Sequence, residues 1–504
     1  MTFRPIRAAR VAPCVLLAFL PLAASAQFAY RTGPFGHALL NSPFPPPTED
    51  YSMGVVRGNF DGDSEDDLVV VANGQATLNV LFGLPWVIGT AVPGNKFAFT
   101  TFTPGFTFDF TTFAAGDFDA DGRDELVISH SGYSAVAASA GRVYVMKRAV
   151  GGGWSVQETI EQGSNGYAGG AEANDRFGSA LAVGDFDNDG FDDLAIGAYG
   201  EDVGSTNEAG AVTVAYGSAT GITAARDVIF TRDNDGLSNP PATLDRYGYA
   251  LASGDFNDDG YDDLAIGVPR ARCPFSGETG GAVVMLLGSA SGIVATGSKR
   301  FNPGLNDIDG GCNEGGGFGS TLVSGRFDAG LRADLAVSTL ENGVHVIYAS
   351  ATGALDEPGN QLFTPASLGG ATITESRFGR TLASGRLRRP TGFSAVGLDS
   401  LAISAGYDTV NGLEGAGSLT VIHATTAGLD PASAERITHS ANLQGSAAIA
   451  GEHFGNTLAI GNFNGDVALD LAIGVNDYPA AGSVGAGAMY VLYGSEFIFR
   501  DGFD

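Results

Sequence analysis

The chain has 504 residues, of which 27 are Lys or Arg and 56 are Asp or Glu, giving a formal net charge of −29. This acid excess argues against nucleic acid as a partner, because phosphate binding requires Lys and Arg. Hydrophobic residues make up 44%, enough for a buried core, and the 75 glycines have no Gly-X-Y period, which excludes collagen and favours many turns between short strands.

Residues 1–26 are predicted to be a secretory signal peptide. Three arginines within the first ten residues precede an apolar stretch at 15–22, and Ala24-Ser25-Ala26 has the small-residue pattern of a cleavage site. The stretch is too short for a membrane span, and no later run reaches about 18 apolar residues. We expect an exported protein without a membrane span that is secreted, periplasmic or at the cell surface; an uncleaved anchor is the less favoured alternative. Residues 27–50, rich in proline, are expected to be an irregular lead-in.

One motif recurs seven times between residues 51 and 495, with a mean spacing of about 67 residues. Its copies are GNFDGDSEDDLVVV (58–71), GDFDADGRDELVIS (116–129), GDFDNDGFDDLAIG (184–197), GDFNDDGYDDLAIG (254–267), GRFDAGLRADLAVS (325–338), an eroded copy at 385–404, and GNFNGDVALDLAIG (461–474). Five copies have an aromatic-Gly pair upstream: Phe177-Gly178, Tyr247-Gly248, Phe318-Gly319, Phe378-Gly379 and Phe454-Gly455. Such regularity indicates a stack of equivalent structural units.

Each unit contains strand patterns and no helical period. After each motif an apolar segment alternates with period two, as in Val212, Val214 and Tyr216, which indicates a strand with one buried face. A four-stranded unit of this size cannot bury both faces alone, whereas seven units in a ring can. We therefore predict an all-β fold, a seven-bladed β-propeller of four-stranded antiparallel blades; a β-solenoid is the alternative. Residues 28–35 or 496–504 are expected to close the ring. We favour 496–504, which also suits a sorting tail.

The loop inside each motif is a candidate cation site. In the copy at 185–193, carboxylates occupy positions 1, 3, 5 and 9 (Asp185, Asp187, Asp189 and Asp193), Gly190 at position 6 permits a positive φ, and the carbonyl of Phe191 adds an oxygen at position 7. Hard oxygens at alternate positions suit Ca²⁺, with Mg²⁺ the second choice. The pattern is not an EF-hand, because position 12 falls in an apolar strand.

The seven loops differ in completeness. Besides 185–193, two loops are complete, with ligands Asp117, Asp119, Asp121, Arg123 (carbonyl) and Glu125, and Asp255, Asn257, Asp259, Tyr261 (carbonyl) and Asp263. Two weaker loops lack glycine at position 6 and contain Asn59, Asp61, Asp63 and Asp67, and Asn462, Asn464, Asp466 and Asp470. The loops at 326–334 and 385–404 are expected not to bind a cation. The alternative, that all are ordinary Asx-rich turns, is weakened by three complete loops at one repeat position.

Two cysteines, Cys273 and Cys312, remain after the predicted signal is removed. Exported proteins with two cysteines usually pair them, so we predict a structural disulfide.

The FG…GDF-DxDG-DDLAIG units resemble FG-GAP repeats, which occur in the head of integrin α chains and in many bacterial exported proteins. The resemblance covers roughly residues 51–495 and implies a seven-bladed propeller with Ca²⁺ in loops between the first two strands of some blades. The first two copies depart from the family in lacking the aromatic-Gly pair. No integrin leg region, transmembrane helix or RGD sequence is seen, so an integrin role is not implied.

No catalytic arrangement stands out. The six histidines show no metal-ligand spacing, and there is no GxSxG, P-loop or Cys-His pair. The favoured hypothesis is a monomeric, non-enzymatic, Ca²⁺-stabilised module that binds an extracellular protein or glycan through loops on a propeller face. The alternatives are a polysaccharide lyase or hydrolase and a structural envelope component.

Overall fold

The structure is a computed structural model, and it describes residues 14–18, 53–72, 78–83, 97–102, 112–274, 276–304, 308–340, 343–350, 354–355, 359–369, 377–387, 397–439, 448–465, 469–476 and 488–492. In these residues the one helix is a 3₁₀ turn, η1 (Pro431–Ser433). None of the described helices has the length and hydropathy needed to cross a membrane.

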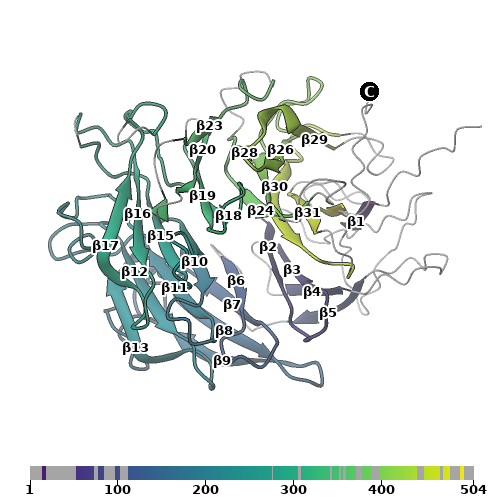
Figure 1. Ribbon diagram of the computed structural model, residues 1–504. Helices are drawn as coiled ribbons and strands as arrows, with labels where there is room; N and C mark the ends of the chain where they lie inside the picture. Colours follow the sequence, from purple (N-terminus) through teal and green to yellow (C-terminus); the bar gives the residue numbers. More distant parts are fainter. Residues whose placement is uncertain are drawn as a thin grey trace, which may run out of the picture.

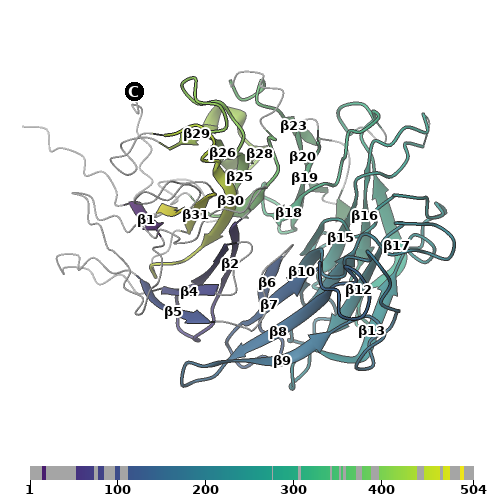
Figure 2. The ribbon, with the colours of Figure 1, turned by 180° about the vertical axis from the view of Figure 1, so that it is seen from behind.

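Seven four-stranded antiparallel sheets stand around a common centre, which confirms the predicted seven-bladed β-propeller (Figure 1). The innermost strand of each blade contacts the innermost strand of the next blade, and that of the last blade contacts that of the first, which closes the ring. The same ring is seen from behind in Figure 2.

The blades are numbered 1 to 7 along the chain. Blades 1 to 3 are β2 (Met53–Gly58), β3 (Asp67–Ala72), β4 (Leu78–Gly83), β5 (Phe97–Phe102); β6 (Phe113–Gly116), β7 (Glu125–His130), β8 (Arg142–Arg148), β9 (Trp154–Ile160); and β10 (Ala180–Gly184), β11 (Asp193–Ala198), β12 (Ala211–Tyr216), β13 (Thr223–Phe230). Blades 4 and 5 are β14 (Leu251–Gly254), β15 (Asp263–Val268), β16 (Ala282–Leu287), β17 (Val294–Phe301); and β18 (Leu322–Gly325), β19 (Asp334–Ser338), β20 (Val344–Ile347), β23 (Gln361–Phe363).

Blade 6 is β24 (Leu382–Gly385), β25 (Ser400–Ala405), β26 (Ser418–Ile422) and β29 (Glu435–Thr438), and blade 7 contains β30 (Phe454–Gly461), β31 (Asp470–Val475) and β32 (Ala488–Leu492). Two small hairpins, β21 (Ala349–Ser350) with β22 (Ala354–Leu355) and β27 (Ala424–Thr425) with β28 (Gly428–Leu429), follow the third strands of blades 5 and 6.

The second and third strands of the blades are buried on both faces. All six residues of β11 and all six of β12 are buried, because neighbouring blades cover both sides of a sheet. The expectation of a single buried face for the third strand is therefore wrong for β12: its alternation reflects packing against two different blades. The outermost strand β13 does carry exposed residues.

The aromatic-Gly motif joins one blade to the next. Phe177, Tyr247 and Phe318 are fully buried and form parallel bridges to Gly141, Gly210 and Gly281 at the start of the preceding blade's third strand. A Cβ on Gly141 would lie 2.1 Å from the carbonyl oxygen of Phe177, so only glycine fits there.

The fourth strand of blade 7 is β1 (Cys14–Ala18), which pairs with β32 and lies inside the predicted signal peptide. Figures 1 and 2 both show β1 beside this blade. Residues 28–35 and 496–504 lie outside the described residues, so a closing role for 496–504 stays a prediction. The ring closes independently of β1, because β30 contacts β2 directly.

A reciprocal hydrogen bond links the motif loops of adjacent blades. The carboxylate at position 8 accepts the backbone N–H of position 1 in the preceding blade, and its own N–H donates to that residue's carbonyl oxygen. The carboxylate bonds are Asn59 to Asp124 (2.8 Å), Asp117 to Asp192 (2.9 Å), Asp185 to Asp262 (3.2 Å), Arg326 to Asp399 (2.9 Å) and Asn462 to Asp66 (2.7 Å). In blades 5 and 7, position 8 is Ala333 or Leu469, and the backbone bond alone remains.

We expect these position-8 carboxylates to contribute to the free energy of unfolding. Replacing Asp192 with Ala removes the acceptor of the Asp117 N–H, and we expect a loss of about 1–3 kcal/mol in the free energy of unfolding. Urea denaturation in constant Ca²⁺ measures this loss. Asp233→Ala, at an exposed position, is the control and should change the free energy by less than about 0.5 kcal/mol. Equal effects of the two variants would contradict the structural role.

Candidate metal centre

Two motif loops bring carboxylates together where the first two strands of a blade meet. Ligand oxygens of Asp185, Asp187 and Asp193 in blade 3 lie within 4.8 Å of one another, and so do those of Asp117, Asp119 and Glu125 in blade 2. In the part of the chain that the structure describes, these are the clusters formed by three or more acidic, His or Cys side chains. Blade 4 offers Asn257 at position 3, an oxygen donor of another class.

Side-chain to backbone hydrogen bonds shape each complete loop. The position-1 carboxylate accepts the N–H groups of positions 5 and 6; for Asp185 these belong to Asp189 and Gly190, both at 3.0 Å. The carboxylate at position 5 then accepts the N–H of position 7, at 3.1 Å in all three loops. These side-chain to backbone hydrogen bonds therefore shape the loop in which the carboxylates converge.

The loop contains two left-handed residues, of which the sequence reasoning found one. Glycine at position 6 has a positive φ, as expected, but so do Ala120, Asn188 and Asp258 at position 4 (φ 53°, 51° and 63°). In blades 1 and 7 the glycine stands at position 4 instead, where Gly62 and Gly465 have φ of 81° and 71°. These two loops lack glycine at position 6, but they have glycine at position 4, the other position where the backbone has a positive φ.

The position-9 carboxylate has a structural task besides any cation. Both oxygens of Asp193, which is fully buried, accept backbone N–H groups: one from Phe186 (2.9 Å) and one from Gly217 after the third strand (2.8 Å). Asp334 makes the same bonds to Phe327 and Ala349 in blade 5, whose loop has Arg326 and Gly330 in place of the acids at positions 1 and 5. Burial raises the pKa of Asp193 to about 8 and that of Asp334 to about 7.

The position-3 carboxylates hold the oxygens that fit a cation best. One oxygen each of Asp61, Asp119 and Asp187 is shielded from solvent and has no hydrogen-bond partner among the described residues. A buried carboxylate oxygen without a donor is costly, and a hard cation would satisfy it. The donor set of blade 3 therefore fits a divalent hard cation.

Basic side chains approach two of the complete loops. In blade 3, Arg226 contacts the outer oxygen of Asp187 at 2.7 Å, but its side chain is 46% exposed and it reaches that carboxylate alone. In blade 2, Lys147 contacts Asp119, Asp121 and Glu125 together. Although burial alone would lower the pKa of Lys147, its bonds to these carboxylates raise it. Among the described residues, no ion pair reaches Asp255, Asp259 or Asp263 in blade 4.

The loops of blades 1, 5 and 7, which depart from the complete pattern, make different contacts. In blade 1 the amide of Asn59 donates to the carbonyl of Asp63 (2.8 Å), and burial raises the pKa of Asp67 to about 8. In blade 7, Asn464 is fully buried, and Asp466 lies outside the described residues. In blade 5, Arg326 donates to the carbonyl of Gly330 at 2.7 Å, so a guanidinium stands across that loop.

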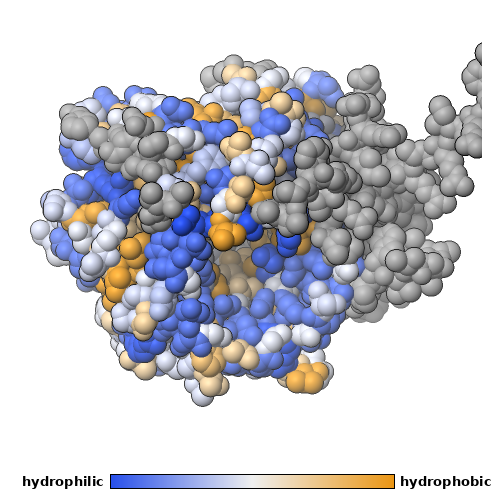
Figure 3. All heavy atoms as spheres, viewed as in Figure 1, coloured by the Kyte–Doolittle hydropathy of each residue, from blue (hydrophilic) through white to orange (hydrophobic). Residues whose placement is uncertain are grey.

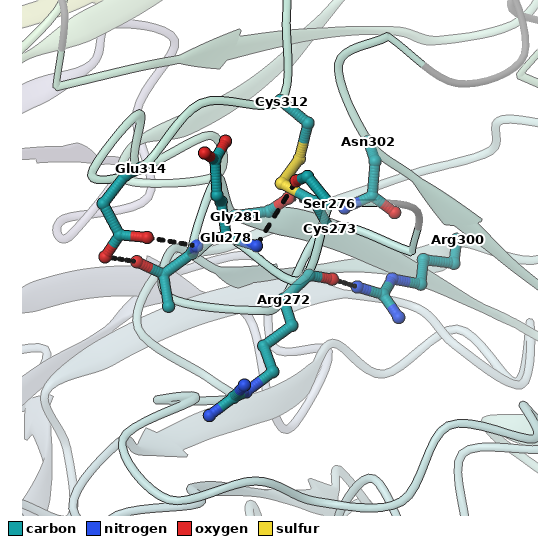
Figure 4. The surroundings of a disulfide bond; sticks show 10 residues. Arg272, Cys273, Ser276, Glu278, Gly281, Arg300, Asn302, Cys312 and Glu314 are labelled. Atoms are coloured by element: carbon teal, nitrogen blue, oxygen red, sulfur yellow. Dashed lines mark hydrogen bonds between the residues drawn. A yellow bond between two sulfur atoms is a disulfide. The ribbon is translucent and has the colours of Figure 1, made fainter.

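At the opposite ends of the strands, Cys273 and Cys312 form a disulfide, with Cα atoms 5.9 Å apart (Figure 4). It joins the loop between β15 and β16 to the segment leading into blade 5. Glu314 braces the same place by accepting from the hydroxyl of Thr279 at 2.8 Å.

Two of the described histidines are buried and contact polar side chains of the fold. His423 is buried in the place that Tyr216 takes in blade 3 and contacts Ser400 at 2.8 Å. The sequence reasoning missed His439, which is buried between Glu452 (2.8 Å) and the hydroxyl of Tyr490 (2.7 Å). These residues are far apart in sequence, so no spacing pattern reveals them.

The comparisons with known proteins agree with this geometry. The family "FG-GAP repeat" matches residues 110–146, 177–214 and 247–285, which contain the three complete loops. Phosphatidylinositol-glycan-specific phospholipase D of Rattus norvegicus is 34% identical over 171 residues, covering 34% of this chain and 19% of that protein. Integrin alpha-5 of Xenopus laevis is 28% identical over 227 residues, covering 43% of this chain and 20% of that protein.

The chain spans about a fifth of the length of these curated relatives. A solved structure, of BBS1N in complex with ARL6DN, aligns over 90% of this chain and 96% of that chain at 11% identity with a TM-score of 0.44, a likeness too low to support a conclusion.

The raised pKa of the position-9 carboxyls predicts that the free energy of unfolding depends on pH. Asp334 in blade 5 allows a test in a loop that is not expected to bind a cation. The pKa of Asp334 is raised by burial from 3.8 to about 7. Between these values the native state holds a proton that the unfolded state has released, so the free energy of unfolding falls as pH rises from about 4 to about 7. Asp334→Asn cannot titrate, and urea denaturation between pH 4 and 8 in constant Ca²⁺ should show a shallower fall than in the wild type. Identical pH slopes would contradict this assignment.

Proposed function

We propose that this chain, which is an FG-GAP repeat β-propeller, is an exported, Ca²⁺-stabilised module that binds an extracellular protein or glycan. The observation that carries the cation part is the blade 3 loop. It gathers three carboxylates within 4.8 Å, and one oxygen of Asp187 has no other partner among the described residues.

The residues that would hold the ion in blade 3 are Asp185, Asp187, Asp189 and Asp193, with the carbonyl of Phe191. In blade 4 they are Asp255, Asn257, Asp259 and Asp263, with the carbonyl of Tyr261. A bound Ca²⁺ would supply positive charge that relieves repulsion between these carboxylates. Because the loops are already shaped by their own hydrogen bonds, the ion would add stability without building the fold.

The binding surface is proposed at the other ends of the strands. In an antiparallel blade, the loop between strands 2 and 3 and the segment leading to the next blade share the end opposite the cation loops. We call this end the loop face. Its segments are cross-braced: Asn174 donates to the carbonyl of Ala138 (2.8 Å), Leu244 to Asn207 (3.0 Å), and the disulfide joins a third pair. Braced loops on a rigid scaffold suit recognition.

The loop face offers aromatic and apolar groups. Tyr199 and Tyr249 have ring centroids 5.4 Å apart, and Arg246 lies over Tyr199. Tyr249, Val136 and Leu340 are 37%, 64% and 69% exposed. The coloured surface on the face of the molecule drawn in Figure 3 is mostly hydrophilic with small separate apolar patches. On the loop face, a few exposed aromatic and apolar side chains favour a polar partner with a few apolar contacts.

The relatives support an extracellular setting. They are integrin alpha chains and a phosphatidylinositol-glycan-specific phospholipase D, and the similarity lies within about a fifth of their length. We assign neither integrin adhesion nor phospholipase activity to this chain.

The cation proposal predicts that Asp187→Asn changes the melting temperature differently with and without Ca²⁺. With Ca²⁺ the variant should melt below the wild type, because a ligand is weakened and mass-action stabilisation by the ion is reduced. With chelator it should melt at or above the wild type, because one repelling charge is gone. Thermal melts in Ca²⁺ and in chelator measure both.

Asp328→Asn is the matched control, since Asp328 holds position 3 in blade 5, where Arg326 and Gly330 replace the acids of positions 1 and 5. Its melting temperature should show the same Ca²⁺ response as the wild type. Wild-type protein whose melting temperature is unchanged by chelator would overturn the cation part of the proposal.

The binding part predicts that Tyr249→Ser weakens partner capture without changing the melting temperature by more than about 3 °C. Immobilised protein is tested in Ca²⁺ against panels of glycans and extracellular proteins. Val150→Ser, which also replaces an exposed apolar residue (89% exposed) but lies in the turn between β8 and β9 on the cation-loop side, is the control. Equal capture by both variants would exclude Tyr249 from the surface. Turnover of a polysaccharide in the same panel would favour an enzyme.

A further inference from the structure

We propose that blade 2 does not bind Ca²⁺, because the ammonium group of Lys147 takes the place of the ion in its loop. This inference rests on the proposed function for the identity of the ion, and it concerns which loops take the ion. The sequence alone predicts the opposite, since the loop at 117–125 is one of the three complete copies.

The contacts of Lys147 are those expected of a central cation. Its Nζ lies 2.9 Å from Asp121, 2.8 Å from Glu125 and in hydrogen-bond contact with Asp119, so it reaches positions 5, 9 and 3 together. The Lys147 side chain is 23% exposed and that of Glu125 is fully buried. A single ammonium thus serves three of the four carboxylates that an ion would need.

Lys147 enters the loop from the end of the third strand, where the other complete loops have a neutral residue. Met146 pairs with Leu126, just as Ala215 pairs with Leu194 in blade 3 and Leu286 pairs with Leu264 in blade 4. The next residue is therefore Lys147, Tyr216 or Leu287. Neither a tyrosine nor a leucine supplies positive charge at that place.

Position 9 differs in blade 2 as well. Blades 3 and 4 have Asp193 and Asp263, whose second oxygen accepts the N–H of a glycine after the third strand. Blade 2 has Glu125, one methylene longer, and its second oxygen accepts from Lys147. The two differences fit each other, because the longer carboxylate reaches the ammonium group.

Arg226 in blade 3 shows that a basic neighbour alone is not enough. It contacts Asp187 from the outer strand β13, is 46% exposed, and contacts no other loop carboxylate among the described residues. It can move into solvent when an ion binds. Lys147 is enclosed by three carboxylates, and displacing it would place a buried positive charge beside a divalent ion.

The test counts bound Ca²⁺ per chain, by equilibrium dialysis with elemental analysis, on the wild type and on Lys147→Met. We expect the variant to bind one more Ca²⁺ than the wild type. Its melting temperature should fall below the wild type in chelator, since Asp119 and Glu125 lose their counter-charge and Asp121 keeps only its ion pair with Arg123. It should recover when Ca²⁺ is added. A purely structural lysine would give the loss without the recovery.

Two further variants fix the location of the gained site. Asp119→Asn alone should leave the wild-type count unchanged, whereas adding Asp119→Asn to Lys147→Met should abolish the gain. Lys299→Met is the matched control, because Lys299 lies in blade 4 and donates to the carbonyl of Leu355; its count should equal that of the wild type.

Each outcome has one meaning. An unchanged count in Lys147→Met, or a count that falls by one in Asp119→Asn alone, would overturn this inference. A wild-type chain that binds no Ca²⁺ would contradict the proposed function, and a single ion gained by Lys147→Met would still support the inference.

Discussion

The reciprocal hydrogen bond between positions 8 and 1 of neighbouring motifs is the interaction on which the propeller depends. It lies where innermost strands of adjacent blades meet, and its last member joins Asn462 to Asp66 across 396 residues of sequence. The chain connects each sheet to the next but does not join the last sheet to the first, so the ring must be closed by non-covalent contacts. Here five of the seven blades present one backbone N–H and one carbonyl to their successor, and blades 4 and 6 present the carbonyl alone. Every blade is thereby held in the same register against the next.

This interaction explains why the motif has two adjacent acids. In Asp192-Asp193 the first carboxylate bonds to the preceding blade, and the second bonds to the end of its own third strand. Both tasks require an acceptor of backbone N–H groups that is buried, and burial raises the pKa of both groups. Part of the acid excess is therefore structural. It gathers buried carboxyl groups near the loops, and because burial disfavours their charged form, a nearby cation, whether an ion or a side chain, stabilises that form.

The sequence allowed the architecture to be predicted, but not the roles of individual residues such as Asp192 and Lys147. Repetition and strand period predicted the seven blades, because both are local properties that the chain repeats. The task of Asp192 was missed because its partner is a backbone N–H in another blade, and backbone groups leave no trace in composition. Lys147 was missed for a related reason: it is separated from Asp119 by a strand, and the register that brings them together emerges only when β7 and β8 pair.

The same loop is neutralised in different ways around the ring. In blade 4 the carboxylates of Asp255, Asp259 and Asp263 have no ion pair among the described residues. Blade 2 encloses an ammonium group, and blade 5 places the guanidinium of Arg326 across a loop that lacks the acids of positions 1 and 5. The position-9 bonds persist in blade 5 even so. Loop shape is therefore set by backbone hydrogen bonds, and the positive charge answers the repulsion that clustered carboxylates create. Positive charge at this place therefore follows from how the motif builds the ring. Blade 2 supplies that charge from its own chain through Lys147, and on the proposal made above it would need no calcium.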